Sequence, residues 1–235
     1  MAPLYIEIKN YILKQIEKGN LKAGDKIPTE RDLMNLFNVS RMTVRHALDA
    51  LVNSGILVRM VGKGTYVSEE KIFTRLNILK SFTEEIIASG HKPSSRLINK
   101  EVEMPSEFIS KKLQINKSQR ILKVTRLRLV DDLEMSITYS YFPLMKAFMI
   151  DKIDFTQTSL YKEIEENVGL KIEKAEEIIT TVSANQTISK HLRIKKGAPV
   201  LKLSRLTIIV NEVPIEYMEG YFRPDRYMVY QELYR

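Results

Sequence analysis

Apolar residues recur at helical spacing twice within the first 55 positions of the chain. Residues 4–18 carry an apolar residue every three or four positions, which predicts a helix of about four turns. The same spacing returns after Ser40, a residue that favours the start of a helix, at Val44, Ala47, Leu48 and Leu51. Between them, Thr29 and Asp32 stand three positions apart, as at the start of a short helix. Three helices are therefore expected before Gly55.

The joint between the second and third helices is very short, because the second ends near Asn38. After Gly55 come two β-prone runs, ILVRMV and TYVSEE, joined by Gly-Lys-Gly at residues 62–64. These runs predict a hairpin with a small, basic tip. Three helices followed by a two-stranded wing describe a winged helix-turn-helix. A small helical domain with a hairpin and no DNA-binding role is the alternative.

The rest of the chain alternates strand-like runs with short helices. Strands are expected over 95–103, 120–130, 133–142, 172–182, 199–210, 213–222 and 227–233, and helices over 81–89, 106–113, 157–167 and 184–192. Hairpin-like turns join many of these strands, which is typical of an α+β domain with an antiparallel sheet. The expected organisation is a DNA-binding domain at residues 1–68, a polar linker at 69–75 and a second domain at 76–235.

An internal repeat lies within the second domain. Residues 109–127 and 188–206 are identical at ten of nineteen positions, at a constant offset of 79. The likeness continues into the strand that follows each copy. A sheet built from two similar halves is expected, with a ligand cleft between them.

The charge distribution changes this picture in one respect. The chain has 235 residues and a formal net charge of +8. Residues 1–70 have ten Lys and Arg against eight Asp and Glu, so they contribute +2 and the remainder +6. The second domain therefore carries most of the excess, which favours an anionic ligand there.

Residue usage excludes several functional classes. The chain has no Cys, which excludes disulfides, thiolate zinc sites and iron–sulfur clusters. Its three His are scattered, so no metal or other cofactor is expected. No stretch approaches the roughly 20 apolar residues of a membrane span, and the N-terminus lacks an apolar signal segment. We therefore expect a cytoplasmic protein with no membrane partner.

The third helix and the wing tip gather cations and short hydrogen-bond donors. The side chains with this chemistry are Ser40, Arg41, Thr43, Arg45 and Lys63. Residues 39–64 hold four Lys or Arg against one acidic residue, Asp49. Cations at the place where a recognition helix meets phosphate favour binding of double-stranded DNA. For neighbouring residues a structural role is the alternative: Arg31 could pair with Glu7 or Asp32, Arg59 could be an exposed strand residue, and His46 a surface helix residue.

Two arginines stand among apolar residues in the strand expected at 120–130. Alternation places Arg126 and Arg128 on the same face as Leu122 and Val124. Burial of a guanidinium is costly unless an acidic side chain or an anionic ligand meets it. Arg126 corresponds to Arg205 in the repeat, so either role is open for it. Arg128 corresponds to Thr207, which favours a ligand role.

Residues 27–67 resemble the winged-helix module of the GntR family of bacterial transcription regulators. They read IPTERDLMNLFNVSRMTVRHALDALVNSGILVRMVGKGTYV, in which P-[ST]-E-R, V-S-R-x-T-V-R and G-x-G-T stand in order at matching spacing. The resemblance implies that Arg31, Arg41 and Arg45 contact DNA, with Thr43 near the bases and Gly62 at the minor groove. Arginine can hold guanine with two donors, and a glycine tip lets the backbone enter a narrow groove.

Residues 74–235 resemble the UTRA effector-binding domain, a chorismate-lyase-like fold found in the HutC-type branch of the GntR family. L-x-S-F-T-E at 79–84, R-x-R at 126–128, S-x-Y at 159–161 and F-R-P-D-R-Y at 222–227 carry the likeness. In members that sense phosphorylated sugars, the resemblance implies a phosphate site made by Arg126, Arg128, Ser159, Tyr161 and the amides of Phe82 and Thr83. Glu216 would then bind sugar hydroxyls.

Two residues depart from that pattern. Thr138 stands where sensors of amino sugars tend to carry Glu, and Phe222 where many members have Tyr. The loss of a carboxylate and a hydroxyl changes which sugar is recognised and leaves the phosphate residues in place.

These observations predict a transcription regulator, more often a repressor in this family, that binds operator DNA as a homodimer and responds to an anionic metabolite such as a sugar phosphate. A regulator of a non-phosphorylated ligand, a constitutive architectural DNA binder and a lyase-like enzyme are the alternatives. Acids such as Glu84, Glu85 and Glu216 could serve an enzyme. The chain has no G-x-S-x-G, HExxH or Walker motif, so no enzyme is expected.

Overall fold

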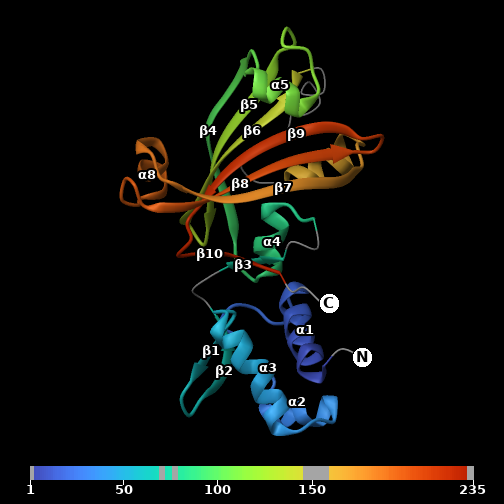
Figure 1. Cartoon of the computed structure of the whole chain (residues 1–235), viewed down its shortest axis with the longest axis vertical. Helices are drawn as coiled ribbons and strands as arrows, with labels where there is room; N and C mark the ends of the chain where they lie inside the picture. The colour runs from blue at the N-terminus through green and yellow to red at the C-terminus, as the bar shows by residue number, and fades with distance from the viewer. Residues whose placement is uncertain (1–2, 69–71, 76–78, 145–158, 232–235) are drawn as a thin grey trace. The chain divides into compact units, whose positions relative to one another are not determined.

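The computed structural model describes residues 3–68, 72–75, 79–144 and 159–231. Its helices and strands form two compact units (Figure 1). The first unit contains Met1–Leu76, Glu85–Lys92 and Asp225–Arg235, and the second contains Asn77–Glu84 and Pro93–Pro224.

The first unit contains the three helices and the hairpin that the sequence predicts. They are α1 (Leu4–Glu17), α2 (Glu30–Phe37), α3 (Arg41–Asn53), β1 (Leu57–Met60) and β2 (Gly64–Val67). A reciprocal capping box starts α2, since the Thr29 side chain accepts from the Asp32 amide at 3.2 Å and the Asp32 carboxylate accepts from the Thr29 amide at 2.9 Å. These bonds lower the pKa of Asp32. Asn38 then ends α2 in the left-handed conformation, with φ at 51°, which makes the tight turn before α3.

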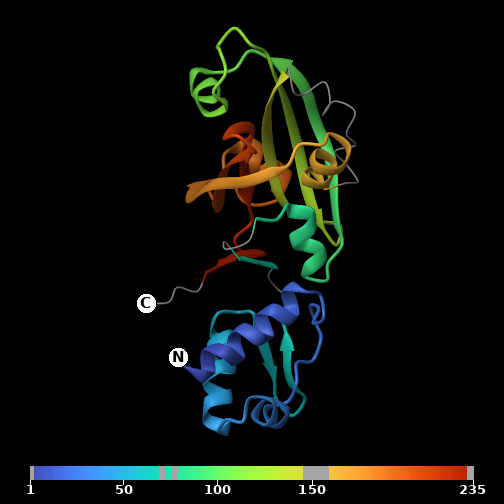
Figure 2. The ribbon, with the colours of Figure 1, turned by 90° about the vertical axis from the view of Figure 1, so that its right-hand side faces the viewer.

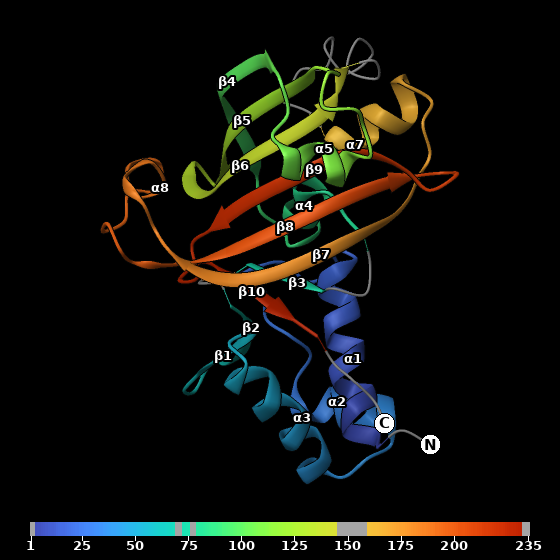
Figure 3. The same ribbon diagram turned by 45° about the horizontal axis from the view of Figure 1, so that its top comes forward.

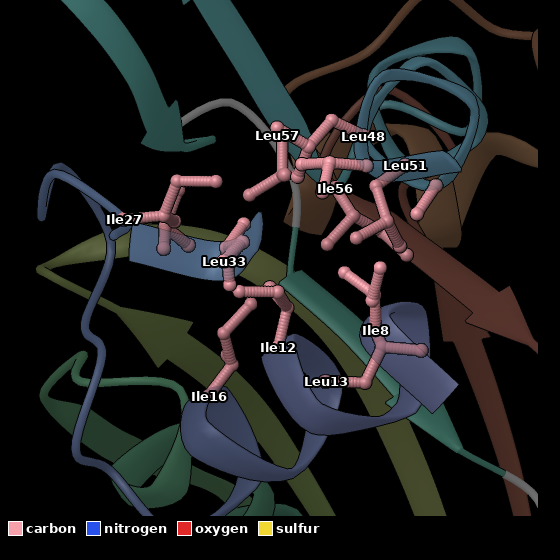
Figure 4. Packing of buried hydrophobic residues seen from close by; sticks show 13 residues of the cluster. Ile8, Ile12, Leu13, Ile16, Ile27, Leu33, Leu48, Leu51, Ile56 and Leu57 are labelled. Atoms are coloured by element: carbon pink, nitrogen blue, oxygen red, sulfur yellow. The ribbon is translucent and has the colours of Figure 1, made fainter. Parts of the chain in front are cut away.

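One apolar core holds these elements together (Figure 4). Its α1 face consists of Ile8, Ile12, Leu13 and Ile16, all at most 1% exposed. The other elements contribute Ile27, Leu33, Val44, Ala47, Leu48, Leu51, Ile56, Leu57 and Val67. The helical spacing of apolar residues in the sequence therefore reports the buried face directly.

A two-stranded parallel sheet completes the first unit. Strand β3 (Ile72–Arg75) pairs with β10 (Tyr227–Tyr230), and Ile72 lies opposite Tyr227. The sequence assigns residues 69–75 to a linker; residues 69–71 lie outside the described residues, and residues 72–75 form this strand. Its partner is distant in the chain, so local spacing could not reveal it. Of the strand expected at 227–233, residues 232 and 233 lie outside the described residues.

The second unit is built on a six-stranded antiparallel sheet in the order β4-β5-β6-β9-β8-β7 (Figure 3). The strands are β4 (Pro93–Glu103), β5 (Ile121–Val130), β6 (Leu133–Pro143), β7 (Ile172–Ser183), β8 (Pro199–Ile209) and β9 (Val213–Phe222). The two repeats supply β5-β6 and β8-β9, and one further strand, β4 or β7, precedes each repeat and completes the half-sheets β4-β5-β6 and β7-β8-β9. They meet edge to edge at β6 and β9, which confirms a sheet of two similar halves.

Short helices cover both faces of this sheet. Each half has a helix between its first two strands, α5 (Glu107–Leu113) and α8 (Gln186–Leu192). On the opposite face lies α7 (Leu160–Lys162), which continues as a π-helix over Glu163–Asn167 (Figure 2). Of the helix expected at 157–167, residues 157 and 158 lie outside the described residues. Helix α4 (Phe82–Ala88) follows Ser81.

The alternation predicted for β5 is confirmed. Leu122 and Val124 pack with Leu160 and other residues on the face that α7 covers. Leu127 and Leu129 pack with α8 on the other face. Arg126 and Arg128 therefore share the α7 face of the sheet.

Replacement of Ile12 by Ala tests the core of the first unit. We expect Ile12→Ala to lower the free energy of unfolding of this unit by about 2–5 kcal/mol, because it leaves a cavity among buried side chains. Leu36→Ala is the control, since Leu36 is 58% exposed, and should change that free energy by less than about 0.5 kcal/mol. Hydrogen exchange of the α1 and α3 amides measures both effects. Equal effects would contradict the assignment of Ile12 to the core.

Candidate binding sites

The first turn of α3 presents short polar side chains and two arginines on its exposed side. The Ser40 hydroxyl accepts from the Thr43 amide at 3.2 Å and lies 2.9 Å from the Thr43 hydroxyl. Arg41 is exposed, and its Nε donates to Glu30 Oε2 at 2.7 Å. Arg45 is exposed one helical turn further on. Of the predicted residues, Ser40, Arg41 and Arg45 are thus exposed, and Thr43 is half-buried.

The hairpin tip is a turn in which the Lys63 amide donates to the Met60 carbonyl at 3.0 Å. Gly62 has a φ of 73° there, a conformation that favours glycine in such a turn. Val61 is 99% exposed and Lys63 is exposed as well. The tip therefore offers backbone and one cation to the surroundings, as the sequence predicts.

Three neighbouring side chains have structural contacts. Arg59 forms an ion pair with Asp49 at 2.8 Å, and the ring of His46 lies 4.4 Å from that of Tyr5. Arg31 is exposed, and its charge contributes to the lowered pKa of Asp32, after the hydrogen bonds from Thr29. The structural alternatives for Arg59 and His46 therefore have direct support.

The second unit buries two guanidinium groups on one face of its sheet. Arg126 and Arg128 are 5% and 4% exposed. Burial lowers the pKa of both, because it penalises the charged form. The positive charge of Arg126 lowers the pKa of Arg128 further, while the negative charge of Glu216 acts in the opposite direction on both. Two positive charges therefore share this face, and the buried carboxylate of Glu216 stabilises the charged form of both.

The first turn of α4 contacts the guanidinium of Arg128. Arg128 Nη2 donates to the Thr83 hydroxyl at 3.0 Å, and its Cζ lies 4.5 Å from the centre of the Phe82 ring. A capping box fixes the turn, since the Ser81 amide donates to Glu84 Oε2 at 2.8 Å and the Glu84 amide donates to Ser81 Oγ at 3.2 Å. The predicted capping box is therefore confirmed, and neutral groups meet Arg128.

The start of α7 joins the same region. The Ser159 hydroxyl lies 2.9 Å from that of Ser81. The Tyr161 hydroxyl lies 3.1 Å from the Thr207 hydroxyl, which donates to Glu216 Oε2 at 3.2 Å. Burial raises the pKa of Tyr161. The residues predicted to hold an effector are thus brought together, and Thr138 lies across from Arg126 in the β5–β6 register.

The repeated arginines have different surroundings. Arg205 Nε donates to Glu177, its cross-strand partner on β7, and Arg205 Nη1 donates to the Tyr161 hydroxyl at 3.2 Å. Arg126 lies across from Leu97 on β4 instead. The second half therefore supplies a carboxylate where the first half has an apolar residue.

Sequence reasoning missed some polar residues of this face. The repeat marks Arg205 only as the counterpart of Arg126, and the role of Glu177 depends on the β7–β8 register, which the sequence does not give. Ser136 and Ser140 flank Thr138 at a period of two, a signal that the sequence does contain.

Two further expectations concern metals and membranes. Over the described ranges, no three His, Asp or Glu side chains form a group able to hold a metal ion. None of the helices there is both long and apolar enough to cross a membrane.

Comparisons with known proteins identify both parts of the chain. Residues 4–67 match the model for bacterial regulatory proteins of the gntR family, and residues 88–228 match the UTRA domain. A winged helix followed by this effector-binding fold defines a class of DNA-binding transcription regulators. The chain belongs to the GntR family, in its UTRA-containing HutC-type branch.

Two curated relatives align with nearly the whole chain. The HTH-type transcriptional repressor NagR of Bacillus subtilis is 36% identical over 96% of this chain and 92% of its own length. The mannosyl-D-glycerate transport/metabolism system repressor MngR of Escherichia coli is 34% identical over 96% of this chain and 93% of its own length. The crystal structure of PhnF from Mycobacterium smegmatis has the same fold, with a TM-score of 0.68, 23% identity and coverage of 97% and 99%. The two curated relatives, NagR and MngR, are transcriptional repressors and not enzymes.

The different surroundings of the buried arginines predict different effects on stability. Arg128→Met should leave the free energy of unfolding unchanged or raise it by up to about 1 kcal/mol, because a buried charge is replaced by an apolar side chain. Arg205→Met should lower it by about 1.5–3 kcal/mol, because Glu177 and Tyr161 lose a charged donor. Thermal and urea unfolding without ligand measure both. A larger loss for Arg128→Met than for Arg205→Met would contradict this assignment.

Proposed function

We propose that the protein is a repressor whose affinity for its operator falls when a small anionic metabolite, a phosphorylated sugar, binds the second unit. The observation that carries this proposal is the buried pair of guanidinium groups, Arg126 and Arg128, on one face of the sheet, where the charge of Glu216 opposes the effect of burial on both. A phosphate would supply the negative charge that this face lacks and accept several hydrogen bonds. Ser159, Tyr161, Phe82 and Thr83 lie at the same place and complete the proposed phosphate site.

The names of relatives support a sugar-derived effector. MngR is named for mannosyl-D-glycerate metabolism, and two other relatives from Escherichia coli strains, each 28% identical, are probable repressors of fructoselysine utilization. The alternative is a non-phosphorylated ligand, such as a carboxylate, which would use the same two arginines. We assign residues 1–68 to operator binding and residues 76–235 to effector binding.

Operator binding is proposed for the outer surface of α3 and for the hairpin tip. Arg41 and Arg45 would contact base edges and phosphates from α3, together with Ser40 and Thr43. Gly62 and Lys63 would lie at the adjacent minor groove, and Arg31 would contact the backbone. A homodimer would place two such surfaces about one helical turn of DNA apart, roughly 10 bp, on a palindromic operator. Such a protein acts where the chromosome lies, in the cytoplasm.

Helix α4 offers a path for the response. Its first residues, Phe82 and Thr83, contact Arg128 and belong to the second unit, whereas Glu85 belongs to the first. Glu85 accepts a hydrogen bond from the Tyr227 hydroxyl on β10 at 3.3 Å. An anion that replaces the Thr83 hydroxyl at Arg128, while the amides of Phe82 and Thr83 bind it, would shift α4, and the shift favours a state with lower operator affinity.

Replacement of Arg45 tests the DNA-binding surface. We expect Arg45→Ala to weaken binding about 5- to 150-fold, the loss of one arginine contact to a base. The measurement is fluorescence anisotropy with a DNA fragment that the wild-type protein selects from a random pool. Arg120→Ala, an exposed arginine of the second unit, is the control and should bind normally. If effector binding is lost together with DNA binding, the division between the two units is wrong.

Replacement of Arg128 tests the effector site. Arg128→Ala should bind the same DNA as the wild type but should lose both the thermal shift with sugar phosphates and the release from DNA that they cause. A screen of phosphate, sulfate, sugar phosphates and the matching unphosphorylated sugars provides the ligands. A normal response of this variant, or a shift only with unphosphorylated compounds, would refute the phosphate site.

A further inference from the structure

The tip of the β1–β2 hairpin exposes an apolar side chain almost completely. Val61 is 99% exposed, and Met60, which precedes it, is 44% exposed. The turn favours glycine at position 62, where φ is 73°, but most residue types can occupy the position before that glycine. A polar side chain would form the same turn, so the turn does not account for a valine at its most exposed point.

Two lysines lie beside this tip. Lys63 is exposed in the turn itself. Lys26, also exposed, comes from the segment before α2 and forms an isolated antiparallel bridge with Tyr66. A Cβ atom on Gly64 would lie 2.7 Å from Lys26 Cε and 3.3 Å from Lys26 Nζ. Glycine at position 64 therefore leaves room for the Lys26 side chain at the end of the hairpin.

An apolar point next to two cations fits the minor groove of DNA. Phosphates of both strands border this narrow groove, and minor-groove binding proteins insert apolar side chains into it. Its floor carries only acceptors at A·T pairs, whereas each G·C pair adds the 2-amino group of guanine, a donor that projects into the groove. A valine over this amino group would displace its water and offer no acceptor, which costs free energy.

We infer that Val61 makes the protein select A·T pairs where the hairpin tip enters the minor groove, and that Lys26 and Lys63 bind phosphates beside it. The inference rests on the proposed function, since it assumes that the tip lies in the minor groove of the operator. It adds a specificity-determining residue, Val61, and a phosphate contact, Lys26, to the operator surface.

Base analogues test the inference on the full-length protein. In the DNA fragment that the wild-type protein selects from a random pool, each A·T pair is replaced in turn by 2,6-diaminopurine·T, which adds the 2-amino group and leaves the major-groove pattern unchanged. Affinity measured by fluorescence anisotropy should fall about fivefold or more at one or two neighbouring pairs of each half-site, because a donor is buried without a partner. At those pairs, hypoxanthine·C should bind more tightly than G·C, from which it differs only by the amino group.

Val61→Thr is the matching protein variant. Threonine has nearly the shape of valine and adds a hydroxyl that can accept a hydrogen bond from the amino group. This variant should bind the modified and unmodified fragments with nearly equal affinity. Val102→Thr, the same change at a valine that is 48% exposed on β4, is the control and should discriminate as the wild type does. A Val61→Thr variant that keeps the wild-type discrimination would overturn the inference.

Replacement of Lys26 by Ala tests the phosphate contact. Lys26→Ala should weaken the binding of every fragment by a similar factor and reduce the slope of log affinity against log salt concentration by about one. Lys14→Ala removes an exposed lysine of α1 and should leave the slope unchanged. If the slope of Lys26→Ala equals that of the wild type, the phosphate contact is wrong.

Three further outcomes separate this inference from the proposed function. If the wild-type protein selects no DNA from the pool, operator binding itself fails. If it selects DNA but no added 2-amino group weakens binding, the operator surface stands and the role of Val61 is wrong. If Val61→Thr alters the oligomeric state in sedimentation velocity and leaves the base preference unchanged, the tip is a contact between copies of the chain, which also overturns the inference.

Discussion

The burial of two guanidinium groups on one strand is the constraint around which the second unit is organised. Arg126 and Arg128 are held at neighbouring positions of one sheet face, where burial disfavours the charge of both and the charge of Arg126 further disfavours that of Arg128. Glu216 opposes this effect. Thr83 and Phe82 meet Arg128 with a neutral oxygen and an aromatic ring, contacts that are weaker than those of an anion. If this face binds an anion as proposed, the stability that the fold loses there is the counterpart of the affinity that the site gains, a common pattern in binding sites.

Duplication followed by divergence explains how the sheet tolerates this face. Both halves have the same order of strands and helices, and the symmetric positions 126 and 205 both carry arginine. In the second half, Glu177 neutralises Arg205 directly. In the first half, Leu97 stands across from Arg126 and an additional arginine replaces the counterpart of Thr207. One half therefore forms a structural ion pair, and the other half holds the excess of positive charge.

Local spacing predicted most of the elements, because apolar periodicity and capping residues act over a few positions. The three N-terminal helices, the alternation that places Arg126 with Arg128, and the capping box at Ser81 all belong to this group. Three contacts do not belong to it: the pairing of β3 with β10, the ion pair of Arg205 with Glu177, and the packing of the Phe222 ring against Gly220. Each of these depends on a register between distant segments, which spacing along one segment does not encode. The DNA-binding roles of the α3 side chains stay predictions.

A sensor must gain more from its ligand in one state than in the other, since a ligand that binds both states equally shifts nothing. In the described structure, Arg128 is already engaged by the first turn of α4. Under the proposed function, an anion at Arg128 would compete with the Thr83 hydroxyl for the guanidinium, so its binding free energy would be coupled to the position of that turn. The neutral Thr83 hydroxyl binds the guanidinium more weakly than a charged oxygen would. The difference in binding free energy is available to move the first turn of α4. Under this proposal, the cationic pair that lowers the stability of the fold also sets the size of the response.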